Sequence, residues 1–218
     1  MTNTMGSLLR TALVCCCGLI ALPAFAQPKY EVGLLGLLSS YQSADVTAPS
    51  NSGKTGADFG GGGGLLVGQT GDRWGGELRY LYSKNDFKVE SGSQSASLAG
   101  QSHTIHYDVL FYLKDSDSAV RPFLAVGGGA KVFHPTGAEQ EFQELSDLVL
   151  LTRTTQTRPV GDFGGGVKIR AGDSTAFRIE FRDYVSPTPK EVLTPSIGAD
   201  VGDILHQWTA LVGFSWTF

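Results

Sequence analysis

Cysteine is confined to one short stretch of this chain, and its absence elsewhere excludes several kinds of site. The three cysteines are Cys15, Cys16 and Cys17. No disulfide framework or thiolate metal site can therefore be built from the rest of the chain. A lipoprotein anchor is not expected either, because it would need a small residue before the acylated cysteine, and Val14 precedes Cys15.

The chain has no excess of positive charge and lacks the common cofactor motifs. It has 17 Lys and Arg against 21 Asp and Glu, which argues against a nucleic-acid partner. The segment Gly53-Lys54-Thr55 resembles the end of a phosphate-binding loop, but Ala48 stands where that loop needs its first glycine. No G-x-S-x-G or H-E-x-x-H motif is present. We therefore expect no cofactor, no metal site and no enzymatic activity.

Long apolar runs are also missing, with one exception near the N-terminus. After Arg10, residues 11–23 are mostly apolar, and the run ends in Ala24-Phe25-Ala26. This run is shorter than the roughly 20 residues of a membrane-spanning helix. Small residues at positions 24 and 26 are typical of a cleavage site. Residues 1–26 are predicted to be a cleaved signal peptide for export through the inner membrane, the alternative being an N-terminal anchor helix, and residues 27–218 a single domain.

In place of helical periodicity, the domain shows alternation of apolar and polar residues, which is typical of β-strands. For example, Phe177, Ile179 and Phe181 alternate with charged residues. Eight segments of this kind are predicted to be strands: 29–40, 58–69, 74–84, 103–114, 121–133, 159–170, 175–184 and 204–218. Each is about long enough to cross a bilayer as a tilted strand of ~9–11 residues.

The connections between these segments alternate in length. Residues 70–73, 115–118 and 171–174 are short and rich in Gly, Asp and Ser, as tight turns require. Residues 41–57, 85–102, 134–158 and 185–203 are long and mostly polar. This order predicts an all-β, eight-stranded, antiparallel up-and-down transmembrane barrel, with short periplasmic turns and long extracellular loops. The even strand number lets the first and last strands pair and close it.

Alternation alone leaves open which face points outward, because a soluble lipocalin-type barrel alternates equally well. The unequal loops favour a membrane barrel, and so does the placement of aromatic residues. Trp208 and Phe218 lie ten residues apart on one face, which corresponds to about 25 Å along the membrane normal. Trp74, Tyr82 and Trp208 are predicted to lie in the aromatic girdles, with the apolar face toward lipid.

The C-terminus carries a family resemblance. Phe214, Trp216 and the terminal Phe218 resemble the assembly signal of bacterial outer-membrane barrels, and residues 121–129 (RPFLAVGGG) are similar to one strand of the small OmpA-like barrels. The layout of residues 29–218 resembles that family without a following peptidoglycan-binding domain. The resemblance implies a location in the bacterial outer membrane, a monomer, contact with lipid and lipopolysaccharide, and periplasmic chaperones and the barrel-insertion machinery as assembly partners.

If the aromatic face meets lipid, ten charged residues face the lumen: Glu77, Arg79, Asp108, Lys131, Asp162, Lys168, Arg170, Arg178, Glu180 and Arg182. Buried charges must be paired, so all but Arg170 are assigned to a cross-lumen ion-pair network, in which Glu77 and Glu180 each contact a cation from another strand. Glycine clusters at 60–64, 127–129 and 164–166 are expected to make room for long side chains. The network is interpreted as a plug, the alternative being an ion pathway.

Two further features bear on function. His106 and Asp108 share a strand face and could form a hydrolase site with Ser102 or Ser97, although His106 is more simply a hydrogen-bonding residue of the lumen. Residues 138–151, acidic and then apolar, predict a short helix or a strand extension in the third long loop. The favoured function is a structural or surface-interaction role. The alternatives are a narrow channel for small solutes or ions, and a lipid or lipopolysaccharide hydrolase that uses His106.

Overall fold

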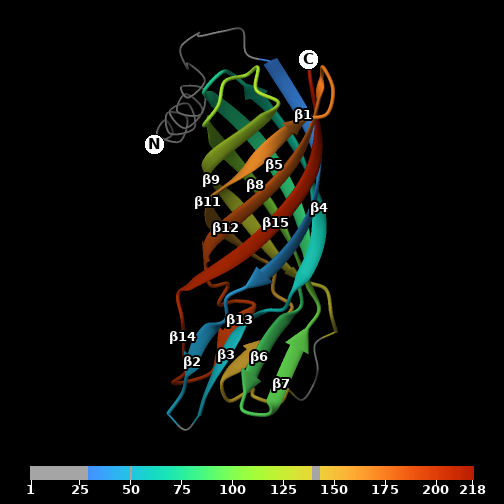
Figure 1. The fold of residues 1–218 in the computed structure, drawn as a ribbon. Helices are drawn as coiled ribbons and strands as arrows, with labels where there is room; N and C mark the ends of the chain where they lie inside the picture. Colours follow the sequence, from blue (N-terminus) through green and yellow to red (C-terminus); the bar gives the residue numbers. More distant parts are fainter. Residues whose placement is uncertain (1–28, 50, 139–142) are drawn as a thin grey trace, which may run out of the picture.

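The computed structural model describes residues 29–49, 51–138 and 143–218, so the predicted signal peptide lies outside the described residues. Eight long strands form one closed antiparallel barrel in the order β1-β15-β12-β11-β9-β8-β5-β4 (Figure 1). Their bounds are β1 (Lys29–Tyr41), β4 (Gly60–Thr70), β5 (Trp74–Lys84), β8 (Gly100–Tyr112), β9 (Val120–Pro135), β11 (Gln156–Arg170), β12 (Thr175–Pro187) and β15 (Ile204–Thr217). The predicted eight-stranded up-and-down barrel is confirmed.

The two ends of the described chain close the barrel by pairing with each other. Strand β1 pairs with β15 from Glu31↔Thr217 to Tyr41↔Gln207. Beyond that ladder, the Tyr30 and Phe218 backbones exchange two hydrogen bonds of 3.0 Å, and their rings stack with centroids 6.3 Å apart. Closure leaves no open sheet edge in the barrel, as a bilayer requires. No helix in the described part of the chain has the length and apolar character needed to cross a membrane.

The outside of the barrel is apolar, whereas its lumen holds charged and polar side chains together with two apolar clusters, one around Leu37 and one around Leu110. On β1, Leu34 and Leu38 are more than half exposed, whereas Glu31 and Ser39 are almost fully buried. On β12, Ile179 and Phe181 point outward and Arg178 and Arg182 are fully buried. Because side chains alternate along a strand, the large apolar residues between these positions face outward along the other strands as well. The aromatic and aliphatic face therefore lies on the outside, as the sequence predicts.

Aromatic side chains gather near both ends of this apolar surface. At the end with the short turns, Trp74 packs on Phe111 with ring centroids 5.0 Å apart, and Phe214 packs on Trp216. Toward the other end, the Tyr82 ring lies 5.5 Å from His103. Trp208 is 46% exposed there, near the start of β15. The structure thus places Trp74 at one rim of the band and Tyr82 and Trp208 toward the other.

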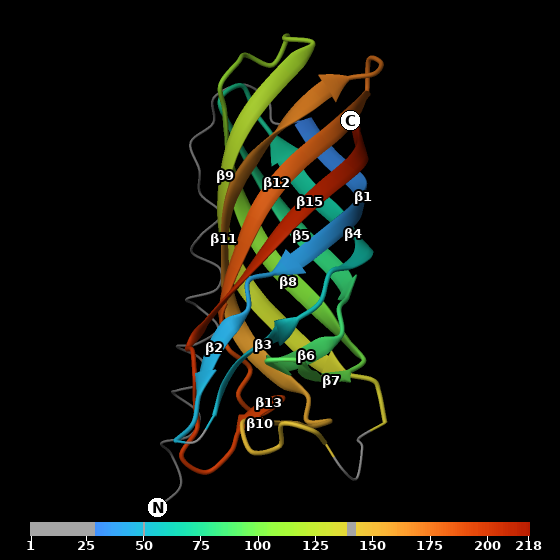
Figure 2. The same cartoon turned by 60° about the horizontal axis from the view of Figure 1, so that its bottom comes forward.

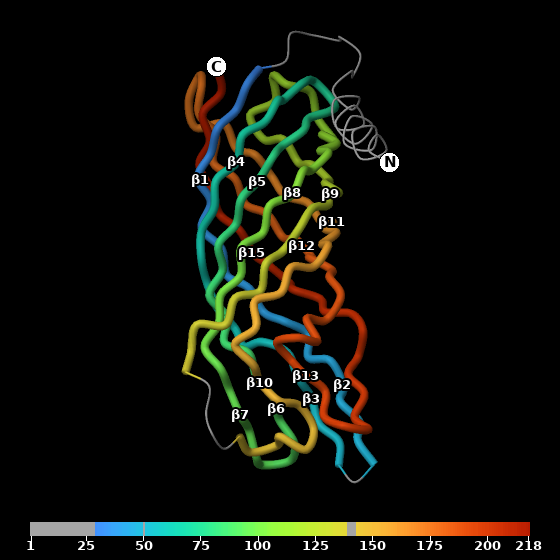
Figure 3. Tube along the Cα trace, turned by 180° about the vertical axis from the view of Figure 1, so that it is seen from behind, coloured from blue at the N-terminus to red at the C-terminus, as the bar shows by residue number. Residues whose placement is uncertain are grey.

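Tight turns join the strands at one end of the barrel. Residues 71–73, 113–119 and 171–174 connect the strand pairs β4–β5, β8–β9 and β11–β12. Gly71 N donates to Trp74 O at 2.9 Å and Ala171 N to Thr175 O at 2.9 Å. Figure 3 shows these connections at the same end as the C-terminus.

The long connections at the opposite end contain short strands of their own, which the sequence analysis did not predict. They contain the strands β2 (Ala44–Thr47), β3 (Ser52–Ala57), β6 (Phe87–Ser91), β7 (Gln94–Leu98), β10 (Val149–Leu151), β13 (Leu193–Pro195) and β14 (Asp200–Val201). Five of them form a sheet in the order β14-β2-β3-β6-β7, and β10 pairs with β13. Figure 2 shows this layer, which we call the outer sheet domain, beyond the barrel end.

The outer sheet domain has a hydrophobic core of its own. Val46, Val89, Leu148 and Val192 are each fully buried there, although they come from four different connections. Tyr41, Phe133 and Leu205, at the ends of β1, β9 and β15, belong to the same cluster. In the third connection, residues 144–148 form turns and β10 follows. Residues 143–151 thus form neither the expected short helix nor an extension of the hairpin, because β10 pairs with β13 instead, and residues 139–142 lie outside the described residues.

Glycines make room in the lumen for long charged side chains. A Cβ built on Gly164 would lie 2.2 Å from Phe181 O and 2.8 Å from Arg182 Cδ. On Gly166 it would lie 2.9 Å from Glu180 Cγ. Such distances are far shorter than van der Waals contact, so a side chain at either position would displace the neighbouring strand or its charged residue. The glycine run on β11 is needed for the packing of the lumen.

Candidate functional site

The centre of the lumen is a square of two arginines and two glutamates from opposite walls of the barrel. Arg79 on β5 lies 2.7 Å from Glu77 and 2.9 Å from Glu180. Arg178 on β12 lies 2.7 Å from Glu77 and 2.8 Å from Glu180. All four side chains are at most 1% exposed. Each glutamate therefore contacts a cation from another strand, and each guanidinium crosses the lumen.

Toward the short-turn end, the square continues through two further residues. Lys168 on β11 contacts Glu31 at 2.5 Å and Glu77 at 3.3 Å, and its Nζ donates to Tyr112 Oη at 2.6 Å. Glu31 also accepts from Arg178 at 3.1 Å. Sequence analysis missed Glu31. The available signal was that Glu31 alternates with the outward-facing residues of β1. Glu31 lies close to the start of that strand, where the inward or outward direction of a side chain is hardest to assign from the sequence.

Toward the outer sheet domain, Arg182 joins three carboxylates. It lies 3.1 Å from Glu180, 3.0 Å from Asp162 and 3.2 Å from Asp108. Asp108 also contacts Arg79 at 3.0 Å. The structure thus links eight of the nine residues assigned to the network, together with Glu31, in one buried cluster.

Lys131 differs from its assignment. It is buried in the lumen, but no described carboxylate lies within ion-pair distance of its ammonium group. Instead Nζ donates to Tyr41 Oη at 2.6 Å and to Gln207 Oε1. It also lies 4.8 Å from the Tyr41 ring centroid and 5.1 Å from that of Phe133. The carboxylates lie deeper in the barrel, and aromatic residues of the outer core surround this lysine.

Arg170 also departs from the expected facing. It is exposed, and its guanidinium donates to Ser116 O at 2.8 Å, across the short turns. The lumen end near these turns is covered instead by Arg121, which lies 3.9 Å over the Tyr112 ring and donates to Gly71 O and Asp72 O. Strand β11 ends at Arg170. The Arg170 side chain therefore lies beyond the part of the barrel wall that encloses the lumen.

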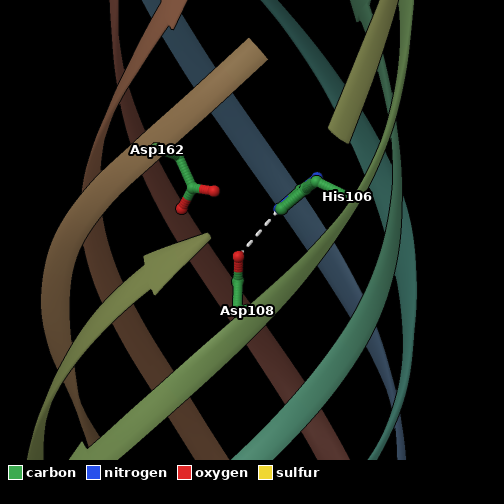
Figure 4. A group of neighbouring side chains, drawn as sticks. All are labelled: His106, Asp108 and Asp162. Carbon is green, nitrogen blue, oxygen red and sulfur yellow. Dashed lines mark ion pairs between the residues drawn. The ribbon is translucent and has the colours of Figure 1, made fainter. Parts of the chain in front are cut away.

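His106 and Asp108 point toward each other in the lumen together with Asp162 (Figure 4). His106 Nε2 lies 3.5 Å from Asp108 Oδ1 and 3.4 Å from Tyr184 Oη. His106 is 2% exposed and Ser102 is 4% exposed, whereas Ser97 belongs to β7 in the outer sheet domain. A histidine enclosed in this way does not reach a lipid substrate, and the hydrolase reading is not supported.

The outer sheet domain presents a shallow, open face lined by both polar and apolar residues. An open groove of about 540 Å³ lies over β2, β3 and β6, lined among others by Asp45, Lys54 and Glu90. Beside it, Lys88 bridges Glu90 at 2.6 Å and Asp58 at 3.5 Å. These two carboxylates hold the pKa of the Lys88 ammonium group above its usual value. The charges on this face are thus partly paired with one another.

Comparison with known proteins identifies the family. A model of the outer membrane protein beta-barrel domain matches residues 12–218, nearly the whole chain. The chain belongs to the outer-membrane β-barrel family. Among proteins with curated descriptions, none matches the chain in sequence. Family membership places the protein in the bacterial outer membrane and confirms the resemblance of residues 29–218 to outer-membrane barrels.

Solved structures support the same fold. Neisserial surface protein A is 14% identical, with a TM-score of 0.55, and the match covers 87% of this chain and 97% of that one. The outer membrane protein OprG from Pseudomonas aeruginosa is 13% identical, with a TM-score of 0.57, over 88% and 96% of the two chains. In this family the short turns face the periplasm and the long connections face outward. The outer sheet domain is therefore extracellular.

Proposed function

We propose that the barrel is a closed, non-enzymatic anchor that holds the outer sheet domain rigidly at the cell surface for contact with another macromolecule. The observation that carries this proposal is the hydrophobic core of the outer sheet domain, to which all four long connections contribute. Loops that only close a barrel need no shared core. Rigid scaffolds that position surface segments are typical of binding proteins.

The filled lumen supports an anchor over a channel. Arg79, Arg178 and Arg182 are fully buried and each contacts two or more carboxylates. An ion crossing the lumen would have to separate these pairs in a low-dielectric interior, which is costly. Narrow eight-stranded barrels are commonly filled by side chains in this manner.

Delivery to the membrane completes the proposal. Residues 1–26 would direct export and be removed, and periplasmic chaperones would carry the mature chain. Phe214, Trp216 and Phe218 would then be recognised by the barrel-insertion machinery. Phe218 directly follows β15 and its side chain is 73% exposed, so it is accessible for such recognition. In the membrane, the apolar outer face would contact lipid, and the extracellular rim would contact lipopolysaccharide.

The test compares the full protein with a variant in which the four long connections are replaced by short turns. Both should give an outer-membrane band that shifts only on boiling. We expect no discrete conductance steps in planar bilayers from either protein. We expect cell aggregation or attachment to immobilised protein and polysaccharide only with the full protein. Discrete conductance steps from the full protein, or attachment unchanged by the replacement, would contradict the proposal.

A finer test uses the groove on the outer sheet domain. Charge reversal by Asp45→Lys with Glu90→Lys should reduce attachment, because both residues line the groove. The matched control is Asp200→Lys, an exposed residue of β14 that does not line it. Equal attachment by the groove variant and the control would assign the contact to another surface.

A further inference from the structure

The cluster of His106, Asp108 and Asp162 has the geometry of a metal site. One ligand atom from each residue lies within 4.8 Å of the other two. His106 and Asp108 lie on β8 and Asp162 lies on β11, the two strands that flank β9 in the barrel. All three are at most 3% exposed. Imidazole and carboxylate are the ligands that Zn²⁺ and similar divalent ions take in proteins.

The carboxylates divide their oxygens between the arginines and this site. Asp108 Oδ2 contacts Arg79 and Arg182, and Asp162 Oδ1 contacts Arg182. The other two oxygens, Asp108 Oδ1 and Asp162 Oδ2, are buried and have no hydrogen-bond partner among the described residues. Metal-ligating carboxylates are commonly held in this way, with one oxygen on the ion and the other on an outer partner.

Gly127 on β9 marks the place where the free oxygens converge. A Cβ built on Gly127 would lie 2.1 Å from Asp108 Oδ1 and 2.5 Å from Asp162 Oδ2. Both oxygens thus lie against the Gly127 backbone, and a side chain at this position would displace them. Two negatively charged oxygens facing each other without a partner repel strongly in a buried site, and either a shared proton or a metal cation between them would remove this repulsion.

The charge count of the cluster points the same way. Within the ion-paired cluster alone, without Lys131 and Arg121, five carboxylates (Glu31, Glu77, Asp108, Asp162 and Glu180) contact four cations (Arg79, Lys168, Arg178 and Arg182). One carboxylate charge is left over, and the unpartnered oxygens lie beside His106. The 3.5 Å between His106 Nε2 and Asp108 Oδ1 is close to the ligand spacing of a tetrahedral ion with bonds of about 2.0–2.1 Å.

We propose that His106 Nε2, Asp108 Oδ1 and Asp162 Oδ2 bind a divalent transition-metal ion that pins β8 to β11 inside the lumen. The long contact of His106 with Tyr184 Oη, at 3.4 Å, is weak and gives way to the ion. Because the site is enclosed, the ion enters before the barrel closes and is retained afterwards. The role is structural, and it is independent of the proposed surface function.

The experiment measures metal in the whole protein, expressed without a histidine tag in cells supplied with Zn²⁺ and purified from outer membranes in detergent. We expect about one Zn²⁺ per chain. His106→Gln and Asp162→Asn should each lower the metal content about tenfold or more. The matched control is His206→Gln, because His206 forms the other His–Asp contact, with Asp183 at 2.8 Å, but is 37% exposed outside the lumen.

The thermal stability of Asp162→Asn also distinguishes a bound metal from a proton shared between Asp108 and Asp162. The amide keeps an oxygen for Arg182 and imitates a protonated acid, so it would preserve or raise the thermal stability if Asp108 and Asp162 merely share a proton. If the site holds a metal, the variant loses the stabilisation. A wild-type protein without stoichiometric metal, or a metal content unchanged in both lumen variants, would overturn the proposal.

Poor folding of the variants would not prevent the test. X-ray absorption of the zinc in the wild-type protein should show one imidazole and oxygen neighbours. A set of several imidazoles would place the metal elsewhere and overturn the assignment. A reduced metal content in Gly127→Ala, which retains all three ligands but fills the space between the two oxygens, would support it.

Discussion

Loss of one arginine from the lumen should destabilise the whole barrel. Arg178 is fully buried and contacts Glu31 at 3.1 Å, Glu77 at 2.7 Å and Glu180 at 2.8 Å. Arg178→Met keeps most of the volume but leaves five buried carboxylates with three cations. Breaking a buried ion pair by removing one partner costs about 3–5 kcal/mol. We expect the free energy of unfolding to fall by that amount, which is roughly a hundred- to several-thousand-fold in the unfolding equilibrium.

The assay is equilibrium unfolding in urea, in phospholipid vesicles, followed by tryptophan fluorescence and by the heat shift on gels. Arg170→Met is the matched control, because Arg170 is exposed and bonds only to a backbone carbonyl, and it should change stability by less than about 0.5 kcal/mol. Adding Glu77→Gln to Arg178→Met should restore part of the loss, because the pair is coupled. If Arg178→Met were as stable as the control, the lumen would be hydrated and the network would not plug it.

Three other substitutions test facing, crowding and assembly. Val212→Arg, at a half-exposed position on β15, should lower the free energy of unfolding by about 2–4 kcal/mol because it places a charge in lipid. Unfolding in vesicles measures this loss, and an unchanged stability would mean that this face does not meet lipid. Thr209 is buried on the lumen face, so Thr209→Arg should crowd the lumen, prevent the barrel from closing and reduce the heat-shifted band. An unchanged band would indicate spare volume in the lumen. Deletion of Phe218 removes two backbone hydrogen bonds to Tyr30 and should slow the appearance of folded protein in a pulse-chase experiment; unchanged kinetics would argue against the proposed assembly signal.

The barrel could be predicted because its sequence signal is local. Alternation along each strand, as in residues 177–182, decides which side chains face lipid, and turn residues such as Gly71 mark the strand ends. The facing of most lumen charges follows directly from this alternation. The lack of a carboxylate beside Lys131, and its contacts with Tyr41 and Gln207 instead, could not be predicted, because they depend on strand stagger, which sets how deep each residue lies. Alternation places Lys131 on the correct face but does not give its depth.

The outer sheet domain could not be predicted for a different reason. Its strands are as short as Asp200–Val201, too short for alternation to be recognised. Its core residues, such as Val46 and Val192, are separated by most of the chain and meet only after the barrel has brought the four connections together. The metal-like arrangement of His106 and Asp162 is also a product of strand register, because the two residues lie on different strands with β9 between them.

The shared core of the outer sheet domain limits how this surface can change during evolution. In a barrel with independent loops, a pathogen or commensal could replace one loop at a time to escape recognition. Here Val46, Val89, Leu148 and Val192, one from each connection, pack in one cluster, so replacement of any single connection would leave a cavity beneath the other three. Sequence variation among relatives with this architecture should therefore concentrate at hairpin tips, such as the turn at Gly92 with its positive φ of 59°. Larger changes should involve all four connections together.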